Sequence, residues 1–297
     1  MNRSPGRLVS DWLTLARPYQ WTKNGFVLAP VVFSGRVTDP FWLQRALAAF
    51  VLYCLVAAGV YALNDAVDAP ADRLHPSKRD RPVAAGRIAP RAAVLAGAGW
   101  MAVGIAGMFV LDVRAGLLGV LYGVSNVVYS TWLKHVVILD VFAIAGFFLL
   151  RLLVGSVVVD VRPSVWLLLC GGLLALYLGV TKRRCELAAG GDASHSQRAV
   201  LSSYSTAFLD QMSTIVSSVT IVAYIMYTLS SETARDLGSE SLAYSSAFVL
   251  YGIFRYQYLV QYQNAADPAR TVFTDPGLLI TVGLWAVYCG AVIYGVF

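Results

Sequence analysis

Three aspartates followed by basic residues are the part of this sequence whose types and spacing are best suited to chemistry. On a helix, Asp65, Asp68 and Asp72 would place their carboxylates on one face. Such carboxylates repel one another unless a cation lies between them, and Mg²⁺ prefers carboxylate oxygens while leaving positions for phosphates. The cations that follow suit phosphate oxygens: they are Arg73, Lys78, Arg79 and Arg81. The pattern predicts a magnesium–diphosphate site.

The alternative for this segment is a solvated loop whose charges only reflect membrane orientation. Orientation explains the basic residues, because loops on the inner side are rich in Lys and Arg, but it does not explain the spaced acids. Pro70 would disturb a regular helix here, so we expect the aspartates to lie on a helix end followed by a turn.

A second charged segment, 182–186, reads Lys-Arg-Arg-Cys-Glu and closes another apolar run. On a helix, Glu186 is spaced to pair with Lys182 and Arg183, and could orient both cations. A plain basic helix end is the alternative interpretation.

Isolated polar residues also occur in otherwise apolar segments. Arg151 and Arg255 are single cations within such segments, and a buried arginine costs several kcal/mol unless it faces a polar cavity or a counter-ion. For both residues, a substrate contact and a salt bridge to another helix stay open. Further candidates lie near the start of the chain and in its middle: they are Arg17, Gln20, Lys23, Asn24, Tyr129 and Lys134.

Long apolar runs must position these residues. Of the 297 residues, 58% are hydrophobic and only 13% charged, about half the charge of a soluble domain. A helix of about 20 apolar residues crosses a bilayer core, and the runs predict one polytopic all-α membrane domain over 1–297 with nine spans. These are 18–35, 47–63, 92–111, 115–133, 136–159, 163–181, 211–231, 241–266 and 276–297.

The distribution of Lys and Arg predicts the orientation of these spans. Basic residues concentrate in the connections that lie inside if the N-terminus is cytoplasmic, above all 64–91 and 182–205. Nine spans then place the C-terminus outside, with the charged connections at the cytoplasmic face of the inner membrane. The net charge of +6 therefore reflects topology, and no nucleic-acid partner is expected. The four cysteines include no CxxC pair for metal or redox chemistry.

The first acidic segment resembles a known family signature. NDxxDxxxD, here Asn64–Asp72, is similar to the first motif of the UbiA superfamily of intramembrane prenyltransferases. This resemblance implies a helical bundle around a central cavity that opens to the cytoplasm, with two Asp-rich motifs that bind a diphosphate through Mg²⁺. The usual second motif, DxxxD, is replaced here by Lys182–Glu186.

Within that superfamily the chain resembles the decaprenyl-phosphate phosphoribosyltransferase branch. The branch extends the first motif as NDxxDxxxDRxHPxKxxRPxAxG, which is matched from Asn64 to Gly86 and includes His75. Its KRxxEL run is matched at 182–187, and its RPxQWxKN segment at 17–24.

The resemblance implies a pentosyl transfer with unusual substrates. The donor would be 5-phosphoribosyl 1-diphosphate (PRPP) and the acceptor a polyprenyl phosphate, with a product that serves cell-envelope arabinose or ribose donor synthesis. Asp65, Asp68 and Asp72 would hold Mg²⁺, Asn64 would orient a hydroxyl or water, and Lys182 and Glu186 would act at the donor. Phosphates of the donor would be held by Lys78, Arg81, Lys182 and Arg183, and the lipid phosphate by Arg17, Lys23 and Lys134. Bilayer lipids would surround the spans. The chain length of the lipid and homo-oligomerisation stay open.

Three other functions are alternatives. A conventional UbiA enzyme would join a prenyl diphosphate to an aromatic or tetrapyrrole acceptor, but it would need the missing second Asp motif. A CDP-alcohol phosphotransferase needs a DGxxAR run that this sequence lacks. A transporter would use Arg151 and Arg255 but would be expected to show paired Gly- or Pro-interrupted spans.

Overall fold

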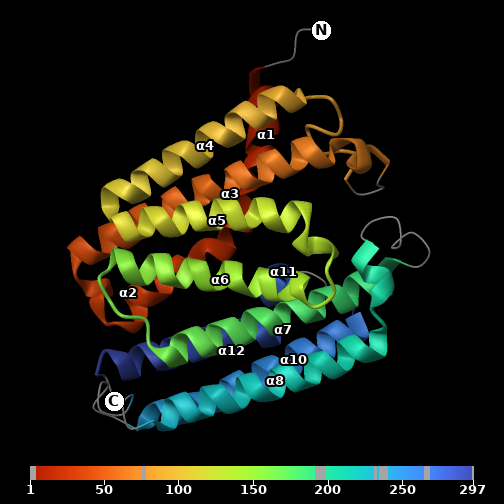
Figure 1. Cartoon of the computed structure of the whole chain (residues 1–297). Helices are drawn as coiled ribbons and strands as arrows, with labels where there is room; N and C mark the ends of the chain where they lie inside the picture. The colour runs from red at the N-terminus through yellow and green to blue at the C-terminus, as the bar shows by residue number, and fades with distance from the viewer. Residues whose placement is uncertain are drawn as a thin grey trace. The chain divides into compact units, whose positions relative to one another are not determined.

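The protein is helical throughout the part that the structure describes. The computed structural model describes residues 5–74, 78–190, 199–230, 233, 240–263 and 268–295, and these ranges contain eleven α-helices and no strand (Figure 1). The chain divides into two compact units. Unit 1 contains residues up to 31, 36–131 and 150–162, and unit 2 contains 32–35, 132–149 and 163–297.

Unit 1 is built around one long helix, α3. The two helices that follow, α4 and α5, lie beside it (Figure 1). Gly59 of α3 and Gly97 of α4 let these helices approach closely, because a Cβ atom at Gly59 would lie 2.5 Å from the carbonyl oxygen of Gly97. The elements of this part of the chain are α1 (Pro5–Ala16), η1 (Pro18–Leu28), α2 (Ala29–Phe33), η2 (Arg36–Thr38), α3 (Pro40–Leu74), α4 (Pro90–Leu111) and α5 (Val113–Thr131).

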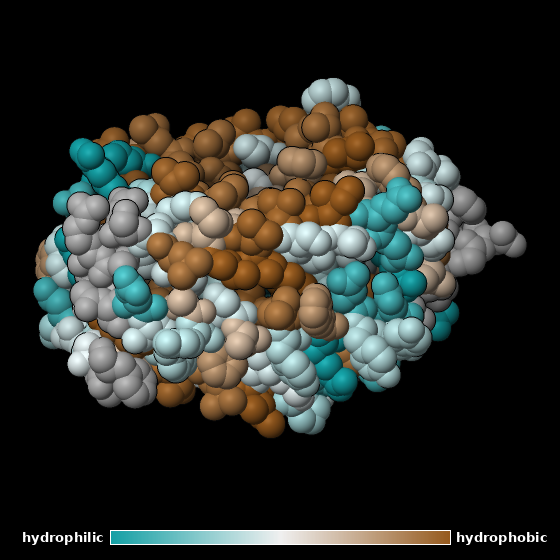
Figure 2. Space-filling view, turned by 90° about the horizontal axis from the view of Figure 1, so that it is seen from below, coloured by the Kyte–Doolittle hydropathy of each residue, from teal (hydrophilic) through white to brown (hydrophobic). Residues whose placement is uncertain are grey.

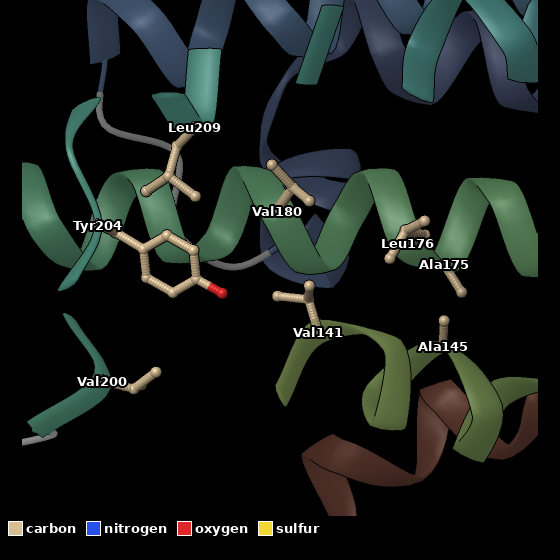
Figure 3. Packing of buried hydrophobic residues seen from close by; sticks show 8 residues of the cluster. All are labelled: Val141, Ala145, Ala175, Leu176, Val180, Val200, Tyr204 and Leu209. Carbon is tan, nitrogen blue, oxygen red and sulfur yellow. The ribbon is translucent and has the colours of Figure 1, made fainter. Parts of the chain in front are cut away.

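Unit 2 packs its helices around several buried apolar clusters. One cluster joins the start of α6 with α7, η5 and α8 through side chains that include Val141, Val180, Tyr204 and Leu209 (Figure 3). Ser205 caps α8 by accepting a hydrogen bond from the backbone of Phe208. Helix α6 (Leu139–Val158) belongs to unit 2 up to residue 149 and to unit 1 from residue 150. The other elements of unit 2 are η3 (Leu133–His135), α7 (Val165–Gly190), η5 (Ala199–Ser203), α8 (Thr206–Leu229), η6 (Ser241–Ser245), α10 (Ser246–Gln263), α11 (Pro268–Thr274) and α12 (Pro276–Ile293).

Several helices are suited to a bilayer. Six helices in the described ranges are long and apolar enough to cross a membrane, and these are α3, α4, α6, α7, α8 and α12. On α4, Leu95, Val103 and Val110 are 74%, 61% and 87% exposed, which only lipid would solvate at low cost. Figure 2 shows hydrophobic residues gathered in the middle of one face, with hydrophilic residues toward its ends. The predicted count of nine spans stays a prediction.

The elements differ from the sequence-based expectations at several places. The expected eighth span, 241–266, is divided into the 3₁₀ helix η6 and the helix α10. The expected first span, 18–35, is divided into the 3₁₀ helix η1 and the short α2. Helix α3 continues through Pro70 to Leu74, where we expected a turn. A proline near an exposed helix end removes one backbone hydrogen bond, and the buried Ala69 keeps this last part of α3 packed in an apolar cluster. The segment 182–186 lies inside α7, which runs on to Gly190.

Candidate active site

The carboxylates of α3 and an arginine from the turn after it meet in unit 1. Arg81 Nη1 donates to Asp65 Oδ1 at 3.1 Å and to Asp72 Oδ2 at 2.7 Å. Both aspartates are buried, whereas the Arg81 side chain is 29% exposed. Asp65 and Asp72 are two helical turns apart, so the shared contact places them on one face of α3, as their spacing predicts. Asp68 lies between them along the helix and is half-buried.

Arg17 brings a second guanidinium to Asp65 from the residue before η1. Its Nη2 group contacts Asp65 Oδ1, and its guanidinium carbon lies 5.1 Å from the centre of the Tyr61 ring. The backbone of Arg17 is left-handed, with φ 52° and ψ 58°, a conformation that costs a non-glycine residue of order 1–3 kcal/mol. The ion pair and the ring contact fix this strained residue, which is a pattern typical of functional sites.

The turn between α3 and α4 is held by contacts that determine where Arg81 lies. Arg73 Nε donates to the carbonyl of Ala84 at 3.1 Å. Arg87 Nε donates to Asp11 Oδ1 at 2.8 Å and thereby ties the turn to α1. The Nε group of Arg73, which we expected at the substrate, is therefore occupied in ordering this turn.

Other predicted residues lie on neighbouring elements of unit 1. Ser130 Oγ on α5 donates to Asn64 Oδ1 at 2.9 Å, which fixes the amide directly before the first aspartate. Within η1, Lys23 Nζ contacts Gln20 Oε1. The remaining predictions in this part of the chain are Lys78 and Tyr129, which are half-buried, and His75, which lies outside the described residues.

Arg151 lies inside unit 1 among amide, phenol and aromatic groups. It is 4% exposed, and its Nε donates to Asn24 Oδ1 at 2.8 Å. Its guanidinium carbon lies 5.2 Å from the ring centre of Tyr53 and 5.3 Å from that of Tyr122. Asn24 Nδ2 donates in turn to the thiol of Cys54 at 3.3 Å. The structure thus joins two predicted residues, Arg151 and Asn24, by a direct hydrogen bond.

In unit 2, the second charged segment forms a buried ion network. Arg183 is 1% exposed; its Nε donates to Asp140 Oδ2 at 2.7 Å and its Nη1 to Glu186 Oε2 at 2.6 Å. Asp140 is fully buried, and its Oδ1 accepts a hydrogen bond from the Tyr204 hydroxyl at 2.8 Å. Buried charges are tolerated when they are paired and hydrogen-bonded. The charge of Arg183 is therefore balanced within the protein.

Arg255 also has a partner within unit 2. It forms a bidentate pair with Asp275, with Nη2–Oδ2 at 2.8 Å and Nε–Oδ1 at 3.2 Å. Asp275 caps α12 by accepting from the backbone of Leu278 at 2.9 Å. The hydrogen bond from Arg255 lowers the pKa of Asp275 below its usual value. This pairing accounts for the charge of Arg255 without a substrate. Two further predicted residues of unit 2, Lys134 and Lys182, are half-buried.

The donor set on α3 fits Mg²⁺ in its chemistry. Asp65, Asp68 and Asp72 offer hard oxygen ligands on one helix, and two of them already share a single cation, the guanidinium of Arg81. In the described ranges, no group of three His, Cys, Asp or Glu side chains surrounds a common point. Arg17 and Arg81 contact the carboxylate oxygens in this arrangement.

The sequence and the fold are both similar to those of known proteins. A sequence model of the UbiA prenyltransferase family matches residues 26–279. The decaprenyl-phosphate phosphoribosyltransferase of Mycolicibacterium smegmatis is 30% identical, over 98% of this chain and 94% of that protein. That of Mycobacterium tuberculosis strain H37Rv is 28% identical, over 99% and 97%.

The chain belongs to the UbiA prenyltransferase family. It is therefore a multi-pass integral membrane protein and a UbiA-family transferase. The solved structure of a UbiA homolog from Archaeoglobus fulgidus bound to DMAPP and Mg²⁺ has a TM-score of 0.74 at 18% identity, covering 95% of this chain and 99% of that chain. The predicted all-helical UbiA-like fold is confirmed.

Some contacts of this UbiA-family protein were not predicted from its sequence. Tyr204 follows the segment 182–186 by many residues, and its role in the ion network leaves no periodic signal. Tyr61 is one helical turn before Asp65, so its spacing places it on the acidic face and could have indicated a role beside the aspartates, where its ring contacts Arg17. Asp140 is an acid at the start of an apolar helix, which is a recognisable signal, but the sequence does not identify Arg183 as its partner.

Proposed function

We propose that this UbiA-family protein transfers the 5-phosphoribosyl group of PRPP to a decaprenyl-like polyprenyl phosphate. The products are polyprenylphosphoryl-5-phosphoribose, which would serve cell-envelope arabinose or ribose donor synthesis, and pyrophosphate. The observation that carries the proposal is the contact of Arg81 with both Asp65 and Asp72, beside Arg17. Carboxylates that could hold a metal and cations that could hold phosphate oxygens thus lie next to one another, as a metal-bound diphosphate requires. The phosphoribosyltransferase relatives of similar length support this choice of donor.

The reaction exchanges one bond at the anomeric carbon of the ribose. The C1–O bond to the diphosphate breaks, positive charge develops on the sugar, and pyrophosphate leaves. An oxygen of the lipid phosphate then forms the new bond to C1 from the opposite face. Because this acceptor is already an anion, the step needs no strong general base.

Two anionic substrates must approach each other, so the site has to supply many positive charges. On the sequence we assign Lys78, Arg81 and Lys182 to phosphates of the donor. Arg183 was predicted with them, but its charge is held in ion pairs with Asp140 and Glu186. Arg17, Lys23 and Lys134 would hold the lipid phosphate, and Glu186 would orient Lys182 or bind ribose hydroxyls. Arg183 holds Glu186 in place through their ion pair.

The carboxylates of α3 are the proposed Mg²⁺ ligands. Mg²⁺ bound by Asp65, Asp68 and Asp72 would supply Lewis-acid neutralisation of the leaving diphosphate. Arg17 contacts Asp65, and Arg81 contacts Asp65 and Asp72, so ligation of a metal by these carboxylates would leave both guanidinium groups for phosphate oxygens. In the absence of metal the carboxylates therefore hold two arginines that can bind phosphate once the metal displaces them.

The membrane arrangement is part of the proposal. One polytopic domain would cross the inner membrane nine times, with the N-terminus cytoplasmic and the C-terminus outside. The connections 64–91 and 182–205 would then meet water-soluble PRPP at the cytoplasmic face, while bilayer lipids surround the spans. Labelling of single cysteines introduced at each end, from either side of sealed vesicles, tests this topology.

A conventional prenyl transfer is the second candidate, because the similar Archaeoglobus fulgidus structure is bound to DMAPP and Mg²⁺. The experiment that separates the two candidates offers the purified protein each donor in turn. We expect pyrophosphate release with PRPP and polyprenyl phosphate together, and none with a prenyl diphosphate and an aromatic acceptor. Release only with the second pair would refute the phosphoribosyl proposal.

A further inference from the structure

A strained residue lies between the turn that carries Lys134 and helix α6. Ile138 has φ +71°, the left-handed region, which is a genuine outlier for a β-branched side chain. Its side chain is 37% exposed, so burial of the isoleucine does not explain the conformation. Something else must hold the backbone in this state.

The hydroxyl of Tyr204 holds this backbone. The amide of Ile138 donates to Tyr204 Oη at 2.6 Å, and the same hydroxyl donates to Asp140 Oδ1 at 2.8 Å. Figure 3 shows the Tyr204 ring beside α7, with its hydroxyl directed toward Val141 at the start of α6. Burial raises the pKa of Tyr204 to about 12, so the hydroxyl keeps its proton and makes both bonds at neutral pH.

The same network reaches the second charged segment. The other oxygen of Asp140 accepts from Arg183 Nε at 2.7 Å, and Arg183 Nη1 donates to Glu186 at 2.6 Å. A continuous chain of hydrogen bonds therefore runs from the backbone of Ile138 to a carboxylate that is 26% exposed. All of its members belong to unit 2.

We infer that Tyr204 is a positioning residue that fixes the turn at 133–138, so that Lys134 keeps its place for the lipid phosphate. This inference rests on the proposed function, because it adds a specificity element for the acceptor. The ribosyl donor depends less on it, since Arg183 keeps its ion pairs with Asp140 and Glu186 when the hydroxyl is removed.

Tyr204→Phe tests the inference because it keeps the ring in its apolar cluster. We expect the KM for polyprenyl phosphate to rise about tenfold, as for one lost buried hydrogen bond, while the KM for PRPP changes less than about threefold. The matched control is Tyr177→Phe, a buried tyrosine of the same unit whose hydroxyl donates to Ile253 O at 3.4 Å. Both of its KM values should stay within about twofold of the wild type.

A second variant separates positioning from a general packing defect. Glycine adopts positive φ without strain. Ile138→Gly should therefore favour the native turn even without the hydrogen bond from the amide of residue 138 to the Tyr204 hydroxyl, which we call the clamp. In Tyr204→Phe/Ile138→Gly, the KM for polyprenyl phosphate should fall back below that of Tyr204→Phe alone. A packing defect at residue 204 would not respond to glycine at 138. Equal KM values for the single and double variants would overturn the inference.

Hydrogen exchange of the purified full-length protein tests the clamp without turnover. The amide of Ile138 should exchange about tenfold faster in Tyr204→Phe, because it loses its acceptor, and at the wild-type rate in Tyr177→Phe. Unchanged exchange in Tyr204→Phe would overturn the clamp. If the wild type releases no pyrophosphate from PRPP, the proposed function fails, and this measurement still decides the clamp.

Discussion

The two charged motifs of this protein keep their cations in different ways. In unit 1, Arg81 is 29% exposed and contacts Asp65 and Asp72, and Arg17 also contacts Asp65, so the Asp65 carboxylate is shared by two cations. In unit 2, Arg183 is 1% exposed and faces the fully buried Asp140. The proposed function requires the cations of the first motif to exchange a carboxylate for a substrate phosphate, which this sharing permits, whereas the ion pair of Arg183 is sealed inside the protein.

The buried ion pair of Arg183 and Asp140 binds no further ligand without a large desolvation cost, so in the proposed function the substrate contacts of 182–186 are assigned to the less buried Lys182 and Glu186. The buried arginine then sets the position of the exposed acid.

Breaking the buried pair of unit 2 should have the largest effect. Arg183→Gln leaves the charge of Asp140 buried without its guanidinium, which should destabilise the fold by about 3–5 kcal/mol. Thermal unfolding in detergent measures the loss. The double variant Asp140→Asn/Arg183→Gln removes both charges and should recover part of the stability. If it unfolds at a lower temperature than Arg183→Gln, the two residues do not act as a pair.

The acidic face of unit 1 should matter for activity more than for folding. Asp65→Asn keeps the shape of the side chain but removes the charge that we assign to Mg²⁺, so kcat should fall about 100- to 1,000-fold. The control is Asp112→Asn, which disturbs an exposed pair with Arg114 and should change kcat less than about twofold. Initial rates of pyrophosphate release measure both, and similar losses in the two variants would contradict the assignment.

Arg81→Lys tests whether the planar guanidinium is needed. Arg81 contacts both aspartates through the single nitrogen Nη1, which a lysine amine can replace, but lysine lacks the planar fork that would hold phosphate oxygens. The kcat/KM for PRPP should therefore fall about 10- to 100-fold. The exposed Arg91 on α4 supplies the control, because Arg91→Lys should leave kcat/KM within about twofold. A KM for PRPP that stays at the wild-type value in Arg81→Lys argues against phosphate contact.

The smallest effect is expected at Asp275, where charge supports a helix end. Because the hydrogen bond from Arg255 lowers the pKa of Asp275, its charge stabilises the fold above the ordinary carboxylate pKa of about 3.9, and this contribution is lost as pH falls through the folded value. Asp275→Asn keeps the cap and should lower Tm by only about 2 °C near pH 7. The Tm difference should vanish in acid. A Tm difference between wild type and Asp275→Asn that grows as the pH falls would contradict the lowered pKa of Asp275.

Local spacing was enough to predict the acidic face. Asp65 and Asp72 contact one guanidinium because residues seven apart return to the same side of a helix. The expected break at Pro70 was wrong: α3 continues to Leu74, and the residue beyond Pro70 that is buried, Asp72, is held there by its ion pair with Arg81. One missing backbone hydrogen bond near a helix end does not outweigh this contact. Helix periodicity is a local property, which is why it can be read from sequence.

Tertiary partners could not be predicted in this way. Arg183 and Asp140 are 43 positions apart, and Tyr204 joins them from a third element, so no short pattern contains the network. Arg255 had two open interpretations until the structure paired it with Asp275. The left-handed conformation of Ile138 is invisible in sequence, because nothing about an isoleucine suggests positive φ.

The central claim is that the carboxylates of α3 bind a divalent ion for departure of the donor's diphosphate. The most direct test is pyrophosphate release from PRPP and polyprenyl phosphate by wild type and Asp68→Ala, measured across a magnesium titration and after chelation. Chelation should abolish release by the wild type, and Asp68→Ala should need more magnesium or stay inactive. Unchanged release by chelated wild type, or wild-type behaviour of Asp68→Ala, would contradict the claim.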